Sequence, residues 1–290
     1  MFKKMLVATD LSEASEKFVC SLGSLKAIGT RQTVLVHCFN TREVGLMADR
    51  LMEISRPVFE RQKKMLQDLG FKVTARMVMG LPSLEINRLA DEQACSLIVV
   101  GSTVRTVLGE ILLGSVAGAI IHGATRPVLI LKQKASWGDA KKRCMPLKCD
   151  CLRHVLFPTD FSDNAEHAFA YVRKLADCGA KLITLLHVQD RGLIGSHLKD
   201  RLEEFNRIDS DRLRRLRGKL KKLGVRNVNI ELPYGSPKKE IIDRACAGKA
   251  SLVVVGSQGR GYMGDIFLGS VSHAVARRSE VPVLVIPPVK

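Results

Sequence analysis

The sequence has little of several features that define other classes of protein. Aromatic residues make up only 5% of its 290 residues, and there is a single tryptophan. No apolar run approaches the roughly 18 residues that a membrane-spanning helix needs. The basic start at Lys3 and Lys4 precedes an apolar stretch that is too short for a signal peptide, because Asp10 ends it. We therefore expect neither an export signal nor a membrane span.

Acidic residues are scarce relative to basic ones. The 46 Lys and Arg outnumber 29 Asp and Glu, which gives a formal net charge of +17. A charge of this sign is compatible with a nucleic-acid partner. The eight cysteines are scattered rather than set out as a disulfide framework. In a chain of this length such thiols indicate a reducing compartment, so we expect a cytoplasmic protein.

The chain contains an internal repeat. The segment Lys4–Ser12 recurs as His154–Ser162, and both copies contain Thr-Asp followed by an apolar residue and Ser. Further segments recur in the same order: Val34–His37 as Thr184–His187, Ser96–Ser102 as Ser251–Ser257, and Leu113–Val116 as Leu268–Val271. Because this period is far longer than that of solenoid repeats, each copy should be a whole domain. We predict domains over 1–135 and 153–290, joined by a basic linker over 136–152.

Each copy alternates short β-branched runs with amphipathic stretches. In the second copy we predict strands near 153–159, 181–188, 226–232, 251–256 and 281–286, and helices near 163–178, 197–223, 237–248 and 267–279. Apolar runs with little alternation suit strands that are covered on both faces, as in a parallel sheet. The order predicts two tandem α/β domains of the doubly wound, Rossmann-like class, each with a five-stranded parallel sheet. Ligands bind such sheets at the carboxyl ends of the strands.

A group of glycines follows the fourth predicted strand of the second copy. Gly256, Gly259, Gly269 and Ser270 match the spacing G-x2-G-x9-G-[ST]. Glycines let backbone amides approach an anion, and the N-terminus of the helix predicted after Gly269 favours phosphate. Asp160 ends the first strand of this copy, so its carboxylate should face the same crevice and accept from a ribose hydroxyl or an adenine amine.

Two better-known phosphate motifs do not explain these glycines. Gly259, Gly261 and Gly264 formally spell G-x-G-x-x-G, but only one more strand follows, without an acidic residue at its carboxyl end. The pattern G-x-x-x-x-G-K-[ST] occurs nowhere in the chain, which excludes P-loop chemistry.

With the ordered signatures around the glycines, both copies resemble the universal stress protein family in a tandem two-domain form. The signatures are the glycine motif, Pro158–Ser162, His187–Val188, Gly235–Pro237 and Val281–Ile286. The resemblance implies that the two domains pack on each other as a pseudo-dimer through their last strands. It leaves open whether the whole chain forms a homodimer.

The same resemblance implies an adenine nucleotide as ligand, ATP or another, together with Mg²⁺. Carried over by position, Asp160 and the backbone of Val188 hold adenine and ribose. The phosphates are bound by Gly256, Gly259, Gly269 and Ser270, as the resemblance implies. To these we add Arg260 as a cation beside the phosphates.

The first copy departs from the glycine motif at one position. Val104 stands where the second copy has Gly259, although Gly101, Gly114 and Ser115 match. A β-branched side chain resists positive φ and fills space that a phosphate loop needs. We therefore predict one competent nucleotide site per chain, in the second copy.

Two other features allow a structural explanation beside a functional one. His37 and His187 each follow an apolar strand, and we expect packed or hydrogen-bonded residues rather than general bases. Residues 212–222 hold seven basic and no acidic residues, with leucines at helix spacing. This pattern favours a solvated helix face, and it disfavours specific nucleic-acid binding because no nucleic-acid module accompanies it.

A cysteine group lies at the end of the predicted linker. Cys144, Cys149, Cys151 and His154 place four residues of zinc-ligand type within eleven positions, but their spacing is not that of a standard zinc site. Incidental linker thiols are the favoured interpretation, and a metal site is the alternative.

The sequence therefore favours an ATP-binding module with a regulatory or stress-response role rather than a dedicated enzyme. One alternative is a slow ATPase or nucleotidyl-transfer enzyme, although no obvious general base or paired metal carboxylates accompany the glycines. The other alternative is binding of nucleic acid or an acidic partner through the basic surface, which salt dependence would reveal.

Overall fold

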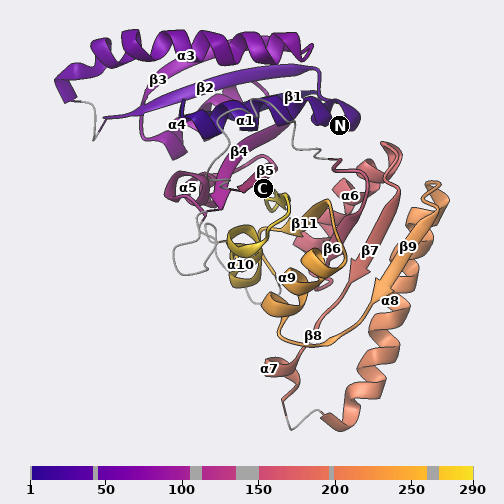
Figure 1. Cartoon of the computed structure of the whole chain (residues 1–290). Helices are drawn as coiled ribbons and strands as arrows, with labels where there is room; N and C mark the ends of the chain where they lie inside the picture. The colour runs from indigo at the N-terminus through magenta and orange to yellow at the C-terminus, as the bar shows by residue number, and fades with distance from the viewer. Residues whose placement is uncertain are drawn as a thin grey trace. The chain divides into compact units, whose positions relative to one another are not determined.

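The computed structural model divides the chain into two compact units, Met1–Cys149 and Asp150–Lys290 (Figure 1). It describes residues 2–41, 45–104, 113–134, 150–195, 199–259 and 268–289. Each unit is an α/β domain built around five parallel strands. The boundary between the units falls within the predicted linker, most of which lies outside the described residues.

The first unit has five parallel strands in the order β3-β2-β1-β4-β5. They are β1 (Lys4–Ala8), β2 (Gln32–Asn40), β3 (Lys72–Gly80), β4 (Leu97–Val104) and β5 (Val128–Lys134). The helices are α1 (Glu13–Ser21), α3 (Ala48–Asp68), α4 (Pro82–Glu92) and α5 (Ser115–Gly123), with 3₁₀ turns η1 (Leu22–Ile28) and η2 (Gly45–Met47). Helices α1 and α3 contact each other, as do α4 and α5, because the strand order reverses direction after β3.

The second unit repeats this arrangement in the order β12-β11-β6-β7-β9. Its strands are β6 (Val155–Pro158), β7 (Leu182–Leu186), β9 (Asn227–Glu231), β11 (Leu252–Gly256) and β12 (Val283–Ile286). Its main helices are α6 (Asp163–Asp177), α8 (Leu202–Lys222), α9 (Pro237–Ala247) and α10 (Ser270–Arg278). The predicted fold class is therefore confirmed, with each predicted strand and helix of the second copy present.

Short elements that the sequence did not indicate surround the end of β7. Strands β8 (Gln189–Asp190) and β10 (Tyr234–Gly235) form a separate parallel pair. Helix α7 (Arg191–Ile194) and the 3₁₀ turn η3 (Lys199–Arg201) follow β8. Two-residue strands and single-turn helices are too short to leave a periodic hydrophobic pattern, so sequence analysis does not detect them.

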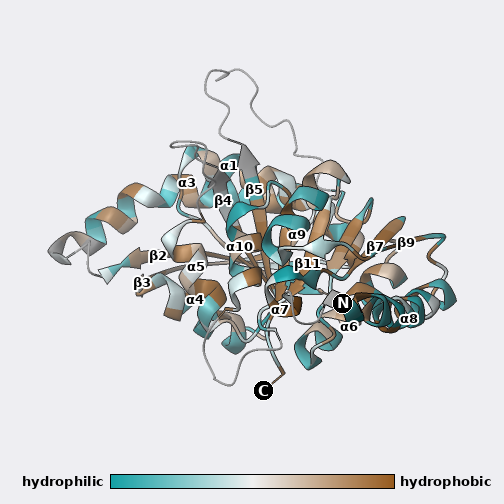
Figure 2. Cartoon of the chain, turned by 90° about the horizontal axis from the view of Figure 1, so that it is seen from below, coloured by the Kyte–Doolittle hydropathy of each residue, from teal (hydrophilic) through white to brown (hydrophobic). Residues whose placement is uncertain are grey.

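The core of each unit lies between its sheet and its helices. The strands are predominantly hydrophobic, and the helices turn hydrophilic faces outward (Figure 2). Leu213 and Leu220 of α8 are fully buried, as the leucine spacing predicts, and Leu66 of α3 is buried in the same way in the first unit. Among the described residues, no helix is long and apolar enough to cross a membrane.

Candidate functional site

A pocket of about 880 Å³ opens at the carboxyl ends of the strands in the second unit. Its walls come from the ends of β6, β7 and β11, from α7 and α8, and from the first turns of α9 and α10. Six of the seven predicted nucleotide-binding residues line it: Asp160, Val188, Gly256, Gly259, Gly269 and Ser270. The seventh, Arg260, lies outside the described residues. The structure thus brings the predicted residues together, and their binding role stays a prediction.

A tight loop after β6 fixes Asp160. Its Oδ1 accepts hydrogen bonds from the Ser162 N–H at 3.1 Å and the Ser162 hydroxyl at 2.6 Å. Ser162 in turn caps α6 by accepting from the Ala165 N–H at 3.2 Å. Phe161, between the two, has a φ of +59°, in the left-handed region that few non-glycine residues adopt. The half-buried carboxylate is therefore held in one place at the mouth of the pocket.

Two glycines of the motif have close neighbours that a β-carbon would have to displace. A β-carbon on Gly259 would lie 2.7 Å from Asp160 Oδ2, and one on Gly256 would lie 3.0 Å from Asn164 Nδ2. Asn164, in the first turn of α6, also donates to the Ser257 hydroxyl at 3.4 Å and to the Gln258 carbonyl at 3.3 Å. The first copy has Ala14 at the position of Asn164, so a comparison of the two copies could have identified this residue.

The chain leaves the sheet immediately after Gly256. The Ser257 N–H donates to the Ile286 carbonyl at 2.7 Å, and the Ser257 carbonyl accepts from the Gly269 N–H, also at 2.7 Å. Helix α10 begins next to this turn, and the Ser272 hydroxyl in its first turn donates to the Gly256 carbonyl at 2.6 Å. The amino end of α10 is thereby held against the pocket, where its first N–H groups favour an anion.

Val188 lies between β7 and β8 and is 8% exposed. Its neighbours His187 and Gln189 donate backbone hydrogen bonds to the carbonyls of Glu231 and Pro233 on the far side of the strand. Within the described part of the chain, no such bond is formed by the Val188 N–H or carbonyl. A backbone donor and acceptor therefore face the pocket at the position predicted for adenine.

A polar network that the sequence did not indicate borders the pocket. His187 Nδ1 bonds the Thr159 carbonyl at 2.7 Å, so the ring is hydrogen-bonded within its unit, as the sequence predicts. Its Nε2 lies 3.4 Å from Asp209 Oδ2, and the other oxygen of Asp209 lies 3.6 Å from the Arg212 guanidinium. Arg212 also stacks over the Phe161 ring at 5.2 Å. Asp209 and Arg212 are on α8. The sequence did not indicate them, because charged residues at these positions look the same as those of a solvent-exposed helix face.

The linker cysteine group is only partly described. Cys144 and Cys149 lie outside the described residues, and Cys151 is buried. His154 uses both ring nitrogens within its own unit, with the Gly248 carbonyl and the Thr184 hydroxyl each at 2.9 Å. Among the described residues, no group of three or more metal-ligand side chains is arranged to hold an ion. The metal alternative for the four residues stays untested.

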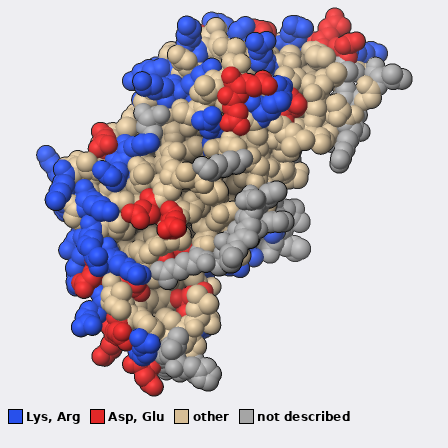
Figure 3. All heavy atoms as spheres, turned by 180° about the vertical axis from the view of Figure 1, so that it is seen from behind, with Lys and Arg blue, Asp and Glu red and all other residues tan. Residues whose placement is uncertain are grey.

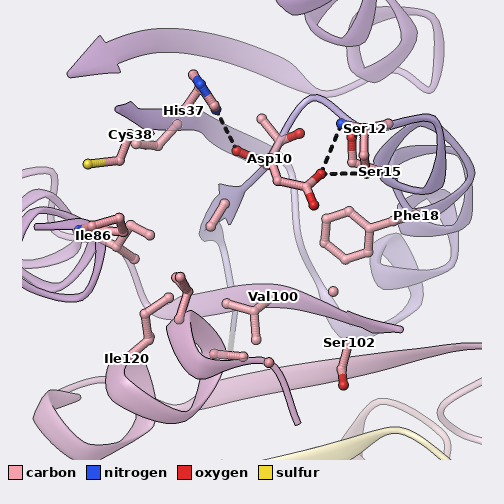
Figure 4. A pocket seen from close by; sticks show the side chains of 18 of the residues that line it. Asp10, Ser12, Ser15, Phe18, His37, Cys38, Ile86, Val100, Ser102 and Ile120 are labelled. Atoms are coloured by element: carbon pink, nitrogen blue, oxygen red, sulfur yellow. Dashed lines mark hydrogen bonds between the residues drawn. The ribbon is translucent and has the colours of Figure 1, made fainter. Parts of the chain in front are cut away.

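The first unit has a related pocket of about 690 Å³ (Figure 4). Asp10 repeats the geometry of Asp160, since its Oδ1 accepts from the Ser12 N–H at 3.0 Å and the Ser12 hydroxyl at 2.7 Å. His37 Nδ1 bonds the Thr9 carbonyl at 2.9 Å, as expected for a structural histidine. Burial lowers the pKa of His37, so the ring is neutral at pH 7.

The two units differ most at the end of the fourth strand. Strand β11 ends at Gly256, whereas β4 continues through Gly101 to Val104 and stays paired with β5 as far as Lys134. The first unit therefore lacks the turn that carries Gly259 in the second. Residue 104 alone does not explain the departure, because a whole backbone segment follows a different path.

The basic residues of α8 form an exposed surface. Lys and Arg side chains gather along the part of the second unit where α8 lies, at the left of Figure 3. Arg214 pairs with Asp211 at 2.7 Å and Lys219 with Glu166 at 4.0 Å, while Arg215 and Arg217 are exposed. Leu213 and Leu220 of the helix are buried on its inner face. This is the arrangement expected for a solvated helix face, and its binding of nucleic acid is not tested.

Comparisons with known proteins agree with the geometry. The model of the universal stress protein family matches residues 1–132 and 152–287. A universal stress protein of Methanocaldococcus jannaschii is 33% identical over 159 residues, which cover 47% of this chain and 98% of that protein. One of Mycolicibacterium smegmatis is 28% identical over 246 residues, or 81% of this chain and 78% of the relative.

A solved structure extends the likeness to the whole chain. The crystal structure of a universal stress protein from Archaeoglobus fulgidus matches with a TM-score of 0.75 and 26% identity, covering 99% of both chains. The family model covers both units in tandem, and the doubly wound sheet is present in each. The chain is therefore a member of the universal stress protein family that carries two copies of the family domain.

Proposed function

We propose that the second unit binds one adenine nucleotide, ATP in the first place, and that the chain acts as a nucleotide-dependent regulatory module. The observation that carries this proposal is the convergence of Asp160, Gly259 and the amino end of α10 on one pocket. The carboxylate of Asp160 suits the hydroxyl donors of a ribose. The backbone at Gly259, which has no side chain, lets a phosphate approach closely, and the N-terminus of α10 favours the negative charge of that phosphate.

The nucleoside fits the side of the pocket formed by β6 and β7. The carboxylate of Asp160 accepts from ribose hydroxyls, and the N–H and carbonyl of Val188, which form no backbone bond in the described part of the chain, match the donor and acceptor edge of adenine. Apolar side chains of Ile194, Phe205 and Ile241 line this part of the pocket and suit a flat ring. The pocket volume of about 880 Å³ lies within the range usual for small-molecule sites.

The phosphates fit the side formed by the turn after β11. The N–H groups at the start of α10 have no acidic side chain in the first turn to compete for them. The Ser270 hydroxyl adds a donor there. The side chain of Arg212 adds a cation elsewhere in the lining, beside Asp209 and Phe161. Since Asp160, Asp190 and Asp209 also line the pocket, a bound Mg²⁺ would reduce their repulsion of the phosphates.

We assign the chain a binding role rather than turnover. Asp160 uses Oδ1 to fix the cap of α6, and His187 uses Nδ1 to bond the Thr159 carbonyl within the same unit. A reducing cytoplasmic location, to which the scattered cysteines of the sequence point, belongs to the same proposal.

Isothermal titration of the intact chain with Mg·ATP tests the site. We expect one nucleotide per chain and at least tenfold weaker binding for Asp160→Asn, a loss of about 1.4 kcal/mol or more. Asp10→Asn is the matched control, because Asp10 makes the same loop contacts in the first unit. Equal affinity of the wild type and Asp160→Asn would reject the proposal. Phosphate release that saturates with ATP would instead support the ATPase alternative.

A further inference from the structure

We propose that α8 is a docking surface for double-stranded DNA, which it binds through phosphate groups without reading the base sequence. The surface consists of six exposed basic side chains in the second half of the helix, which we call the α8 basic cluster: Arg214, Arg215, Arg217, Lys219, Lys221 and Lys222. None of these six described residues lines the pocket assigned to the nucleotide. The inference therefore stands or falls independently of ATP binding in that pocket.

Few carboxylates neutralise the α8 basic cluster. Arg214 pairs with Asp211 at 2.7 Å, and Lys219 pairs with Glu166 of α6 at 4.0 Å. Both pairs are exposed to solvent, where an ion pair contributes little. Within the described part of the chain, the other four cations form no ion pair. The cluster is therefore available to an external polyanion.

The corresponding helix of the first unit shows that the fold does not require such a cluster. Helices α3 and α8 each have 21 residues and occupy the same place in the duplicated domain. Residues 58–68 of α3 include three basic and two acidic residues, whereas the aligned segment 212–222 has seven basic and no acidic residues. Each of the three cations of α3 has a carboxylate partner: Arg61 with Glu16, Lys63 with Glu60, and Lys64 with Asp68. The excess of positive charge thus belongs to the second copy and not to the fold.

The cations of the cluster lie in two rows along α8, on the exposed side where Figure 3 shows Lys and Arg gathered. Helical spacing of three and four residues gives one row of Arg214, Arg217 and Lys221, and a second row of Arg215, Lys219 and Lys222. The first row faces β9, because Lys221 Nζ donates to the carbonyl of Arg226, which precedes that strand. The second row faces α6, with which Lys219 pairs. Gly218 lies between the rows, and a β-carbon added there would meet nothing within 4 Å, so the ridge between them is open.

This arrangement matches the dimensions of duplex DNA. The six cations of residues 214–222 span about 12 Å of helix, or about 2 Å for each positive charge. B-DNA carries one phosphate charge for each 1.7 Å or so of its axis, which is a similar density. Its major groove is about 12 Å wide and accommodates an α-helix about 10–12 Å across. Two rows on opposite sides of the helix then meet the phosphates of the two strands that border the groove.

Other acidic partners fit this surface less well. A protein partner gains most of its affinity from buried aromatic or apolar anchors, and among the described residues 212–226 no large hydrophobic side chain is exposed. A single strand is bound by stacking of its bases on aromatic rings, and the sequence has no aromatic residue between Phe205 and Tyr234. Contacts to duplex phosphates need neither feature, because their affinity comes from the release of counterions.

Fluorescence anisotropy of the intact chain with a labelled 20-base-pair DNA duplex tests the surface. We expect two duplexes of unrelated sequence to bind equally, and log K to fall with log salt at a slope of about −3 to −5, as for three to six phosphate contacts. Arg215→Gln combined with Arg217→Gln should weaken binding at least tenfold and make the slope shallower by about 2. Both side chains are exposed and unpaired among the described residues, so this variant should fold, which circular dichroism verifies.

The matched control is Arg61→Gln combined with Lys63→Gln. It removes the same charge at the aligned positions of α3, so affinity for the duplex should stay within about twofold of the wild type. Equal losses in the two variants would overturn the inference, because only net charge would then matter. An affinity that does not change with salt, or no measurable binding of the duplex in 50 mM salt, would also overturn it. Tighter binding of a single strand, an RNA duplex or polyglutamate than of the DNA duplex would assign the surface to a different partner and reject this one.

Discussion

Gly259 and Asp160 approach each other so closely that a side chain at residue 259 would displace the Asp160 carboxylate or the loop. A β-carbon there would lie 2.7 Å from Asp160 Oδ2, a separation at which the loop or the carboxylate must move. Asp160 in turn is fixed through its other oxygen by Ser162. The glycine turn and the carboxylate are therefore coupled, although they lie about a hundred residues apart in the chain.

This coupling predicts the effect of adding one methyl group to the turn. Gly259→Ala should displace the Asp160 carboxylate and weaken nucleotide binding at least tenfold, without unfolding the unit. Titration calorimetry measures the affinity, and circular dichroism verifies the fold. Unchanged affinity would show that the turn and the carboxylate move independently.

Gly218→Ala is the matched control for a glycine substitution. Gly218 lies within α8, where an added β-carbon meets nothing within 4 Å. Because glycine disfavours a helix interior, this substitution should raise the free energy of unfolding by about 1 kcal/mol. Nucleotide affinity should stay the same, which separates effects on stability from effects on the site.

Asn164 should act on the site through the turn after β11. It donates to the Ser257 hydroxyl and the Gln258 carbonyl, and both bonds are lost in Asn164→Ala. A neutral hydrogen bond contributes about 1 kcal/mol, so we expect nucleotide binding to weaken roughly three- to tenfold. The first unit already has alanine at this position, so the variant should fold. Affinity within twofold of the wild type would exclude a role for Asn164 in holding the turn.

Buried histidines predict a loss of stability in mild acid. Burial lowers the pKa of His154, and both of its ring nitrogens are hydrogen-bonded within the unit. The unfolded chain therefore binds this proton more readily than the folded chain does, so stability falls as the pH drops below about 6.5. The urea midpoint should decrease between pH 7 and pH 5, and His154→Asn should show a shallower decrease. His37, whose pKa is also lowered, accounts for part of the remaining slope. If the urea midpoint of His154→Asn fell with pH as steeply as that of the wild type, His154 would not be the source of the acid sensitivity.

Val104→Gly should not create a second nucleotide site. The backbone at residue 104 pairs with Lys134 as part of the sheet, so removing one side chain does not bend the strand away. Titration with Mg·ATP should still give one nucleotide per chain. A second site in this variant would show that the side chain, not the strand, closes the first pocket to phosphate.

The repeat and the strand pattern predicted the fold closely, because they rest on local features. Buried parallel strands form continuous apolar runs, and the leucines of α8 mark its inner face, so both leave a clear pattern. The carboxyl-edge rule for such sheets predicts from the sequence that Asp160 lies beside the glycines.

Features that depend on contacts distant in the chain were missed. The pairing of His187 with Asp209 joins the end of a strand to the middle of a helix, and nothing in either segment indicates the other. The extension of β4 to Val104 was also not anticipated, because strand ends depend on pairing with a neighbour rather than on local sequence. The packing of the two domains on each other remains a prediction of the resemblance.

Native mass spectrometry of the intact chain with Mg·ATP tests the central proposal most directly, because it counts bound nucleotides. We expect a single added nucleotide per chain, lost in Gly259→Val and retained in Asp10→Asn. Two nucleotides per wild-type chain, none at all, or one that persists in Gly259→Val would contradict a single site in the second unit.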